Sequence, residues 1–395
     1  MAMRVLKTSF VLATTLFILL FSNGINAKSQ EDKKEGAVNT KEEVEEYILH
    51  HIKDSHDFHL FSYTSSEGER KHVGFPLPVI VWSSQGLVSF MSSKFHHDDS
   101  GHHIVEAGGT RFAKLHGKIY ELQPGAESIA FDEEHHATNA TKVLDFSITK
   151  SVLGIVLVGL LMLLLFGSLA KQYKSKKVPT GFGRVLEPLV IYVRDEIARP
   201  NIGDKKYRQF TGYLLTVFFF IWILNLLGLT PLGFNVTGQL AVTAALAIFT
   251  LIIYTVKGNK DYWQHMLWMP GVPVLIRPVL AVIELAGAFL IKPFSLLVRL
   301  FANISAGHIV VMSLIAILIT MKAEMGVVGS SLLSFVLSLF ITLIEVLVAF
   351  LQAYIFTMLS ALFIGMAVAE HDHEHAHDEH GHDKVDAEDV RGNYI

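Results

Sequence analysis

Two long apolar segments near the carboxyl terminus limit the fold of this chain more than any other feature. They comprise residues 274–321 and 328–369. As straight helices they would reach about 72 and 63 Å, whereas the hydrocarbon core of a bilayer is only about 30 Å thick. They must therefore be broken or strongly tilted. Membrane helices tilt by only about 20° on average, so we expect packing against another object to impose this geometry.

The composition agrees with a protein that crosses a membrane several times. Of the 395 residues, 51% are hydrophobic and 18% are charged, and the mean hydropathy is +0.41. We therefore predict a polytopic α-helical membrane protein with about five spans, of which the last two form a long, strongly tilted helical hairpin. The predicted membrane domain is 148–369, with spans at 148–169, 211–230, 239–256, 274–321 and 328–369.

The two ends of the chain and one basic loop predict its orientation. A basic start, an apolar centre and a small-residue exit indicate a signal peptide over residues 1–27 rather than an uncleaved anchor. The loop at 171–208 holds the densest group of lysines and arginines, so the positive-inside rule places it in the cytoplasm. Residues 28–147 are then exported. The His/Asp-rich tail, 370–395, is cytoplasmic and of low complexity.

Within the basic loop, residues 181–197 carry apolar side chains at helical spacing. This pattern predicts a helix that either lies on the membrane surface or is an ordinary cytoplasmic helix.

The exported region is predicted to be a small, His-rich α+β domain. Thr40 and Glu43 form a capping box that predicts a helix, and β-like runs follow at 75–84, 86–93 and 111–122. We prefer a solvated, weakly metal-binding surface to a metal site, because zinc sites require defined ligand spacing and the chain has no cysteine. The candidate ligands include His96, His97, His102, His103, His135 and His136.

Several ionisable residues fall within the two long apolar segments, namely Glu284, Lys292, Arg299, His308 and Glu345. Charge at such depth is costly, so each is a functional candidate. Lys292 could instead reach the membrane surface, and Glu284 could be interfacial. Arg299 lies near the middle of its segment, and its guanidinium cannot lose its proton. We infer that its counter-ion comes from another subunit; the alternative is a structural ion pair.

The spacing of these residues predicts two levels in the hairpin. If the chain turns near Gly326, Arg299 and Gln352 lie 27 and 26 residues from the turn, and His308 and Glu345 lie 18 and 19 residues from it. One level therefore pairs an arginine with an amide. The other pairs an imidazole with a carboxylate, which suits a proton relay, although a static hydrogen bond that locks the hairpin is the alternative.

Two motifs carry a resemblance to a known family. The sequences "KPFSLLVRLFANISAGH" and "FLQAYIFTMLSALFIGMAVAEH" resemble subunit a of the F-type ATP synthase, and the resemblance extends over about residues 145–371. It implies that Arg299 is the essential arginine that faces a subunit c carboxylate between two half-channels. Gly228, where some members have an acid, and the long exported region depart from the family pattern.

The resemblance also assigns the remaining site residues. It implies an outer half-channel lined by His308 and Glu345, and it makes Glu284 a candidate for the inner half-channel. The polar neighbours that it implies for Arg299 are Asn303, Gln352 and Ser295, the last on the same helical stripe as Lys292 and Arg299.

The predicted function is that of a proton-conducting stator subunit of a rotary ATP synthase in a bacterial inner membrane, with a periplasmic amino-terminal domain. The chain would not be an enzyme by itself and would need no cofactor or metal. Its partners would be the c-ring, the peripheral-stalk subunit b and the lipid bilayer. The formal charge of −4 gives no reason to expect nucleic acid.

Two alternatives belong to other classes. A secondary metal-ion transporter would explain the His-rich exported domain, but it predicts ligand clusters within the membrane. A membrane-anchored periplasmic binding protein would not need an intramembrane Arg, His and Glu.

Overall fold

The computed structural model describes residues 54–64, 70–96, 98–126, 128–130, 137–175, 179–230, 234–269 and 271–369. The predicted signal peptide, the predicted helix that begins at Thr40 and the tail at 370–395 lie outside these residues.

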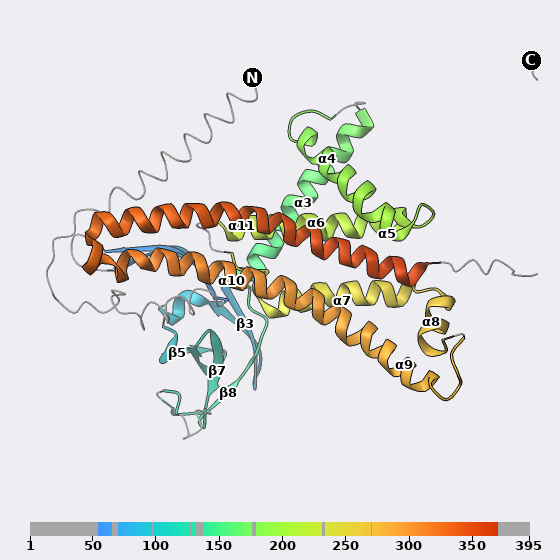
Figure 1. The fold of residues 1–395 in the computed structure, drawn as a ribbon. Coiled ribbons are helices and arrows are strands. Elements are labelled where there is room, and N and C mark those ends of the chain that lie inside the picture. Colours follow the sequence, from blue (N-terminus) through green and yellow to red (C-terminus); the bar gives the residue numbers. More distant parts are fainter. Residues whose placement is uncertain are drawn as a thin grey trace, which may run out of the picture.

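The described residues of the predicted exported region form a β-rich domain, which we call the β-domain (Figure 1). Its only described helix is the short 3-10 helix η1 (Ser92–Phe95). The sheets have the orders β1-β2, β4-β3-β9 and β5-β6-β7-β8. The strands are β1 (Asp57–Thr64), β2 (Arg70–Pro76), β3 (Pro78–Ser83), β4 (Gly86–Met91), β5 (Ser100–Ala107), β6 (Thr110–Leu115), β7 (Lys118–Leu122), β8 (Ala140–Lys142) and β9 (Leu144–Asp145).

Alternation along the strands builds the core of the β-domain. Val79 and Val81 of β3, and Val88 and Phe90 of β4, point inward and are buried together with Phe112 of β6. This period of two is the pattern that a half-buried strand requires. The β-like runs predicted from the sequence correspond to β3, β4, β6 and β7.

Five helices in the described residues are long and apolar enough to cross a membrane, which is the predicted number. The fourth of them consists of two helices, α9 and α10, which the π-helical turn η3 (Gly287–Ile291) joins end to end. The helices are α3 (Lys150–Ser175), α6 (Tyr207–Gly228), α7 (Leu240–Lys257), α9 (Arg277–Ala286) with α10 (Lys292–Thr320), and α11 (Lys322–Val368).

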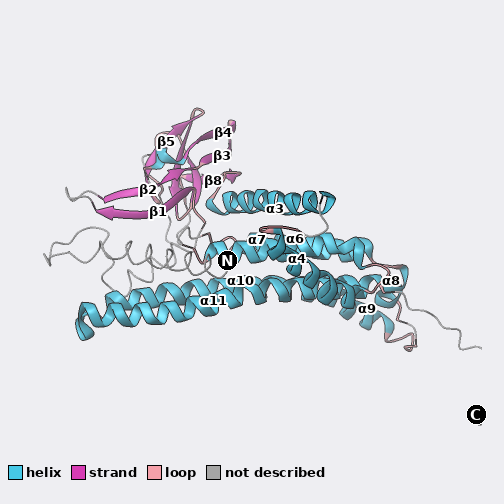
Figure 2. Ribbon diagram, turned by 90° about the horizontal axis from the view of Figure 1, so that it is seen from above, coloured by secondary structure: helices cyan, strands magenta, loops and turns pink. Residues whose placement is uncertain are grey.

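Helices α10 and α11 form an antiparallel hairpin that projects beyond the other helices (Figures 1 and 2). The chain reverses between the end of α10 at Thr320 and a break in α11 at Gly326, whose positive φ of 71° suits glycine. The reversal lies close to the predicted turn. The angle of the hairpin to a bilayer stays a prediction.

The helices have two ends that can be distinguished by their contacts. At the β-domain end, the backbone N–H of Lys150 donates to the Ser55 carbonyl (2.8 Å), and Phe58 packs on Phe234, with ring centroids 5.4 Å apart. At the opposite end, the α8 end, Asn259 Nδ2 donates to the Val368 carbonyl (2.8 Å). Short helices gather toward this end, and they are α4 (Gly183–Tyr192), η2 (Val193–Ala198), α5 (Arg199–Ile202) and α8 (Lys260–Leu267).

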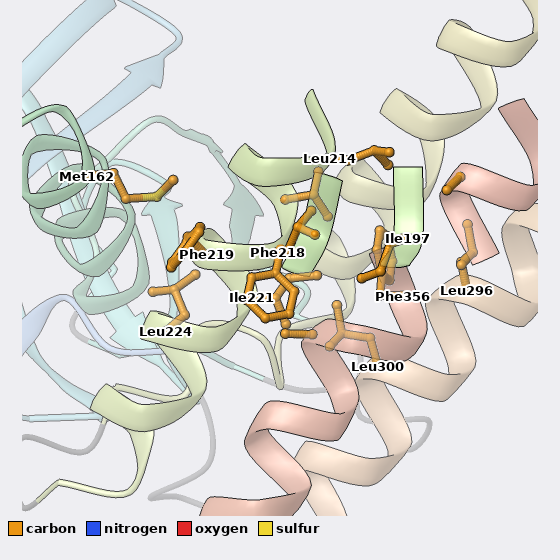
Figure 3. Packing of buried hydrophobic residues seen from close by; sticks show 14 of the residues in the cluster. Met162, Ile197, Leu214, Phe218, Phe219, Ile221, Leu224, Leu296, Leu300 and Phe356 are labelled. Carbon is orange, nitrogen blue, oxygen red and sulfur yellow. The ribbon is translucent and has the colours of Figure 1, made fainter. Parts of the chain in front are cut away.

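The core of the helical region forms around α6. Figure 3 shows side chains of α6, including Leu214 and Phe218, next to Phe356 of α11 and Leu300 of α10. All four are buried. Because α10 and α11 bury part of their length here, the core fixes the position of Arg299, which is adjacent to Leu300 in sequence.

Candidate functional site

Arg299 lies on the surface of α10. Its side chain is exposed, and its guanidinium makes no ion pair or hydrogen bond with any other described residue. An arginine keeps its charge at any ordinary pH, so this cation faces out of the helical hairpin without an internal counter-ion in the described part of the chain.

A buried amide on α11 holds the backbone at Arg299. Gln352 is only 3% exposed, and its Nε2 donates to the Arg299 carbonyl oxygen (2.8 Å). Its Oε1 accepts a hydrogen bond from Asn303 Nδ2 (3.2 Å), one turn further along α10. Gln352 thus connects the two helices at the predicted arginine–amide level. Ser295, one turn before Arg299, is half-buried.

Small and apolar residues surround the exposed arginine. On the same side of α10, Ala302, Ala306 and Val310 are exposed. Small residues on a membrane helix let another helix approach closely. The surface around Arg299 therefore permits the close approach of a neighbouring helix.

The second predicted level brings Glu345 of α11 against Gly307 of α10. A Cβ atom built at Gly307 would lie only 2.5 Å from Glu345 Oε1 and Oε2, so the carboxylate occupies the place of a missing side chain. His308 is the next residue of α10, and its side chain lies outside the described ones. The structure therefore places the Glu345 carboxylate beside the backbone that carries His308.

Toward the α8 end, Lys292 lies among aromatic rings. Its Nζ is 5.5 Å from the ring centroid of Phe363 and 6.0 Å from that of Tyr254, distances at which cation–π attraction operates. The hydroxyl of Tyr254 donates to the carbonyl of Ala288 within η3. A π-helical turn leaves such carbonyls available.

Glu284 is exposed on α9, near the α8 end. Burial raises the pKa of Tyr262 in α8, and the negative charge of nearby Glu284 raises it further. The hydroxyl of Tyr262 is buried and has no hydrogen-bond partner among the described residues. Glu284, the predicted inner-channel acid, thus lies close to Tyr262. It makes no contact with Arg299 among the described residues.

The sequence analysis missed two buried polar networks because it considered only ionisable residues within spans. Asn225 of α6 accepts a hydrogen bond from Thr237 Oγ1 (2.6 Å), and its Nδ2 lies 3.5 Å from the Ala349 carbonyl. The second network joins Tyr213, Thr250 and Ser360 of α6, α7 and α11. The signal for these networks in the sequence was the presence of uncharged polar residues within apolar segments. Gly228, also named above, is buried at the end of α6.

No group of three or more His, Asp or Glu residues that could hold a metal ion occurs among the described residues. His96 and His103 do make an edge-on ring contact, with centroids 4.7 Å apart. Burial works against ionisation of nearby Asp98, but hydrogen bonds from Ser100 and from the backbone of His103 lower its pKa to about 2. Hydrogen bonds from Ser100 and from the backbone of His103 therefore hold Asp98 in this loop.

Two known families match different parts of the chain. Residues 152–365 match the family described as ATP synthase A chain. Residues 47–146 match a family described as a domain of unknown function.

The chain is also similar to several known proteins. It is 42% identical over 258 residues to ATP synthase subunit a 2 of Chlorobaculum tepidum, which covers 63% of this chain and 70% of that protein. It is 44% identical over 250 residues to ATP synthase subunit a of Myxococcus xanthus (62% and 79%) and 38% identical over 292 residues to that of Chloroherpeton thalassium (72% and 80%). These comparisons give no support to the metal-transporter alternative.

Proposed function

This chain belongs to the ATP synthase subunit a family, and we propose on that premise that it conducts protons past Arg299 to and from a rotating c-ring. Members of this family are non-catalytic membrane subunits of the complex, so the chain takes part in ATP synthesis through proton transport. Its partners would be the c-ring, the peripheral-stalk subunit b and the bilayer.

The observation that carries this proposal is the exposed guanidinium of Arg299, which has no ion-pair or hydrogen-bond partner among the described residues. A fixed cation in an apolar surface is stable only if an anion approaches it. A carboxylate on the c-ring supplies that anion each time a site passes. The hydrogen bonds of Gln352 with the Arg299 carbonyl and with Asn303 fix this part of α10 against α11. We therefore expect the charge to stay in place while the ring moves.

Protons reach the ring from two sides of Arg299. The outer half-channel is lined by His308 and Glu345, where an imidazole and a carboxylate can pass a proton at neutral pH. A ring carboxylate that gains this proton is neutral and can rotate into lipid. On the other flank, it loses its proton toward Glu284 and Ser295, and the resulting anion is attracted to Arg299. The permanent charge of Arg299 prevents a direct leak between the half-channels.

The energetics agree with such a device. A proton that moves down about 100 mV supplies about 2.3 kcal/mol, so several protons must pass for each ATP. In this scheme the β-domain is periplasmic and the α8 end is cytoplasmic. The hairpin of α10 and α11 lies strongly tilted along the ring.

ATP-driven acidification of inverted membrane vesicles tests the role of Arg299. We expect the Arg299→Ala variant to lose pumping almost completely while the complex still contains normal amounts of the chain and of the c-ring. Arg184→Ala is the matched control, because it removes an exposed arginine from the predicted cytoplasmic part of the chain. Undiminished pumping by Arg299→Ala at normal assembly would assign this arginine a structural role and refute the proposal.

A further inference from the structure

The β-domain has an apolar face that the proposed function does not explain. The sheet β4-β3-β9 buries one face in the core, but its other face also carries large apolar side chains. We call this second face the outer sheet face. It consists of Trp82, Leu87, Met91, Leu144 and Phe146, which are between 43% and 66% exposed.

Strand register makes these side chains neighbours. Trp82 of β3 lies opposite both Leu87 of β4 and Leu144 of β9, so the three form a row across the whole sheet. Phe146 continues along β3, since its backbone N–H donates to the Ile80 carbonyl (2.8 Å). Antiparallel sheets with one solvated face carry polar residues there, and contiguous apolar patches usually mark an interaction site.

The chain path fixes the outer sheet face close to the membrane. The backbone N–H of Ile148 still donates to the Pro78 carbonyl (3.1 Å), and the predicted membrane helix α3 begins two residues later, at Lys150. Leu144 can therefore lie at most about 22 Å from the start of α3, given at most about 3.6 Å per residue. Figure 2 shows β3 and β4 at the edge of the β-domain beside this helix end.

The joint between the sheet and α3 is also well anchored. Ser151 N–H donates to Asp54 Oδ1 (3.0 Å), in addition to the bond between Lys150 and Ser55. A Cβ atom at Gly154 would lie 2.9 Å from the Phe234 ring, so α3 packs closely on the connection between α6 and α7. The sheet therefore keeps one orientation relative to the helix.

We propose that the outer sheet face docks on the membrane leaflet from which the amino-terminal end of α3 emerges. The exposed apolar side of α3 begins at Val152 and Val156, so the apolar surface of the sheet continues toward the surface that lipid covers. Trp82 and Phe146 then lie at the headgroup level, where aromatic residues are enriched. Strand alternation also places Pro78, Ile80 and Ser89 on this face, and none of them is charged.

Site-directed spin labelling tests this docking in the full complex. The chain has no cysteine, so a single introduced cysteine can be labelled specifically. Labels at Leu87→Cys and Leu144→Cys are compared with one at His102→Cys, an exposed position on β5 at the far side of the β-domain from β3 (Figure 1). The measurement is label accessibility to oxygen, which concentrates in lipid, and to a water-soluble nickel complex, in reconstituted liposomes.

Docking on lipid predicts at least a threefold higher ratio of oxygen to nickel accessibility at positions 87 and 144 than at position 102. Equal ratios at all three positions would show that the face is in water and overturn the proposal. Labels at 87 and 144 that neither reagent reaches would show a protein partner on this face, which also overturns it. Two labelled positions keep the test valid if one variant fails to assemble.

Discussion

The two halves of α11 have similarly apolar sequences but very different surroundings. Residues 349–368, the packed half, bury most of their side chains against α5, α6, α7 and α10. Residues 322–348, the open half, bury only Ser330 and Ser334 among the described side chains. The hydropathy of a span therefore does not reveal which part of it a protein partner covers.

The side-chain types explain the difference between the halves. The packed half carries small and hydroxyl residues at its contacts, such as Ala353, Thr357 and Ser360, which permit close helix approach. The open half presents large apolar residues outward, such as Phe340 and Leu343. It needs lipid or another subunit as a partner, whereas the packed half is complete within this chain.

The largest expected effect comes from Gly365→Ala in the packed half. A Cβ atom at this position would overlap the backbone carbonyl oxygen of Asn201, which cannot move without displacing α5. Overpacking a tight contact costs about 1–3 kcal/mol and occasionally more. We expect little assembled complex, measured as the amount of this chain in purified membranes and as its thermal aggregation temperature.

Gly159→Ala in α3 is the matched control for this substitution. No atom lies within 4 Å of a Cβ built there, so the variant should assemble normally. Equal assembly of Gly365→Ala and Gly159→Ala would contradict the close approach of α11 and α5.

The next effect concerns Gln352, near the boundary between the two halves. Gln352→Leu keeps the volume but removes both hydrogen bonds to α10, each worth about 1 kcal/mol. The backbone at Arg299 then loses its support, and we expect ATP-driven pumping to fall about tenfold while assembly stays near normal. Leu351→Ala removes the exposed neighbour and should pump almost normally. Equal pumping by the two variants would show that Gln352 does not position Arg299.

Part of the arrangement of α10 and α11 can be predicted from the sequence. The arginine–amide level of the hairpin was predicted from the distances of Arg299 and Gln352 to Gly326, because two antiparallel helices advance equally per residue. The same counting predicts that Glu345 lies level with His308, and the structure places its carboxylate against Gly307, the residue before His308. The role of each of these residues in proton transfer stays a prediction.

Other features of the helical region depend on which helices pack together, and the sequence of a single helix does not contain that information. The π-helical turn η3, where Tyr254 meets the Ala288 carbonyl, has no pattern of its own in residues 274–321. The network of Tyr213, Thr250 and Ser360 joins three helices that are distant in the sequence. The strand β5 contains His102 and His103 and has a register irregularity, so its alternation is hard to recognise.

A smaller effect is expected in the open half, whose outward side chains are mostly exposed among the described residues. Gly307→Ala places a methyl group against the Glu345 carboxylate, but this side chain can move because α11 is not packed on its outer side there. We expect normal assembly and a two- to fivefold slower proton flux through membranes stripped of the catalytic part. Ala306→Gly, at an exposed neighbouring position, should leave the flux unchanged. A loss of assembly in Gly307→Ala would show that the open half is as tightly packed as the other.

The smallest effect concerns the joint between the β-domain and α3, whose stability depends on the carboxylate of Asp145. Burial raises the pKa of Asp145, but hydrogen bonds from His56 (2.7 Å) and Ser147 outweigh it and hold the pKa below its ordinary value. The stabilisation is therefore complete above about pH 4 and is lost as the pH falls through the lower folded-state pKa. Amide hydrogen exchange of residues 54–58 should rise only below this pH in the native chain. In Asp145→Asn, exchange should be faster at pH 7 and less dependent on acid. Opening of the native joint between pH 7 and 5 would show that another group controls it.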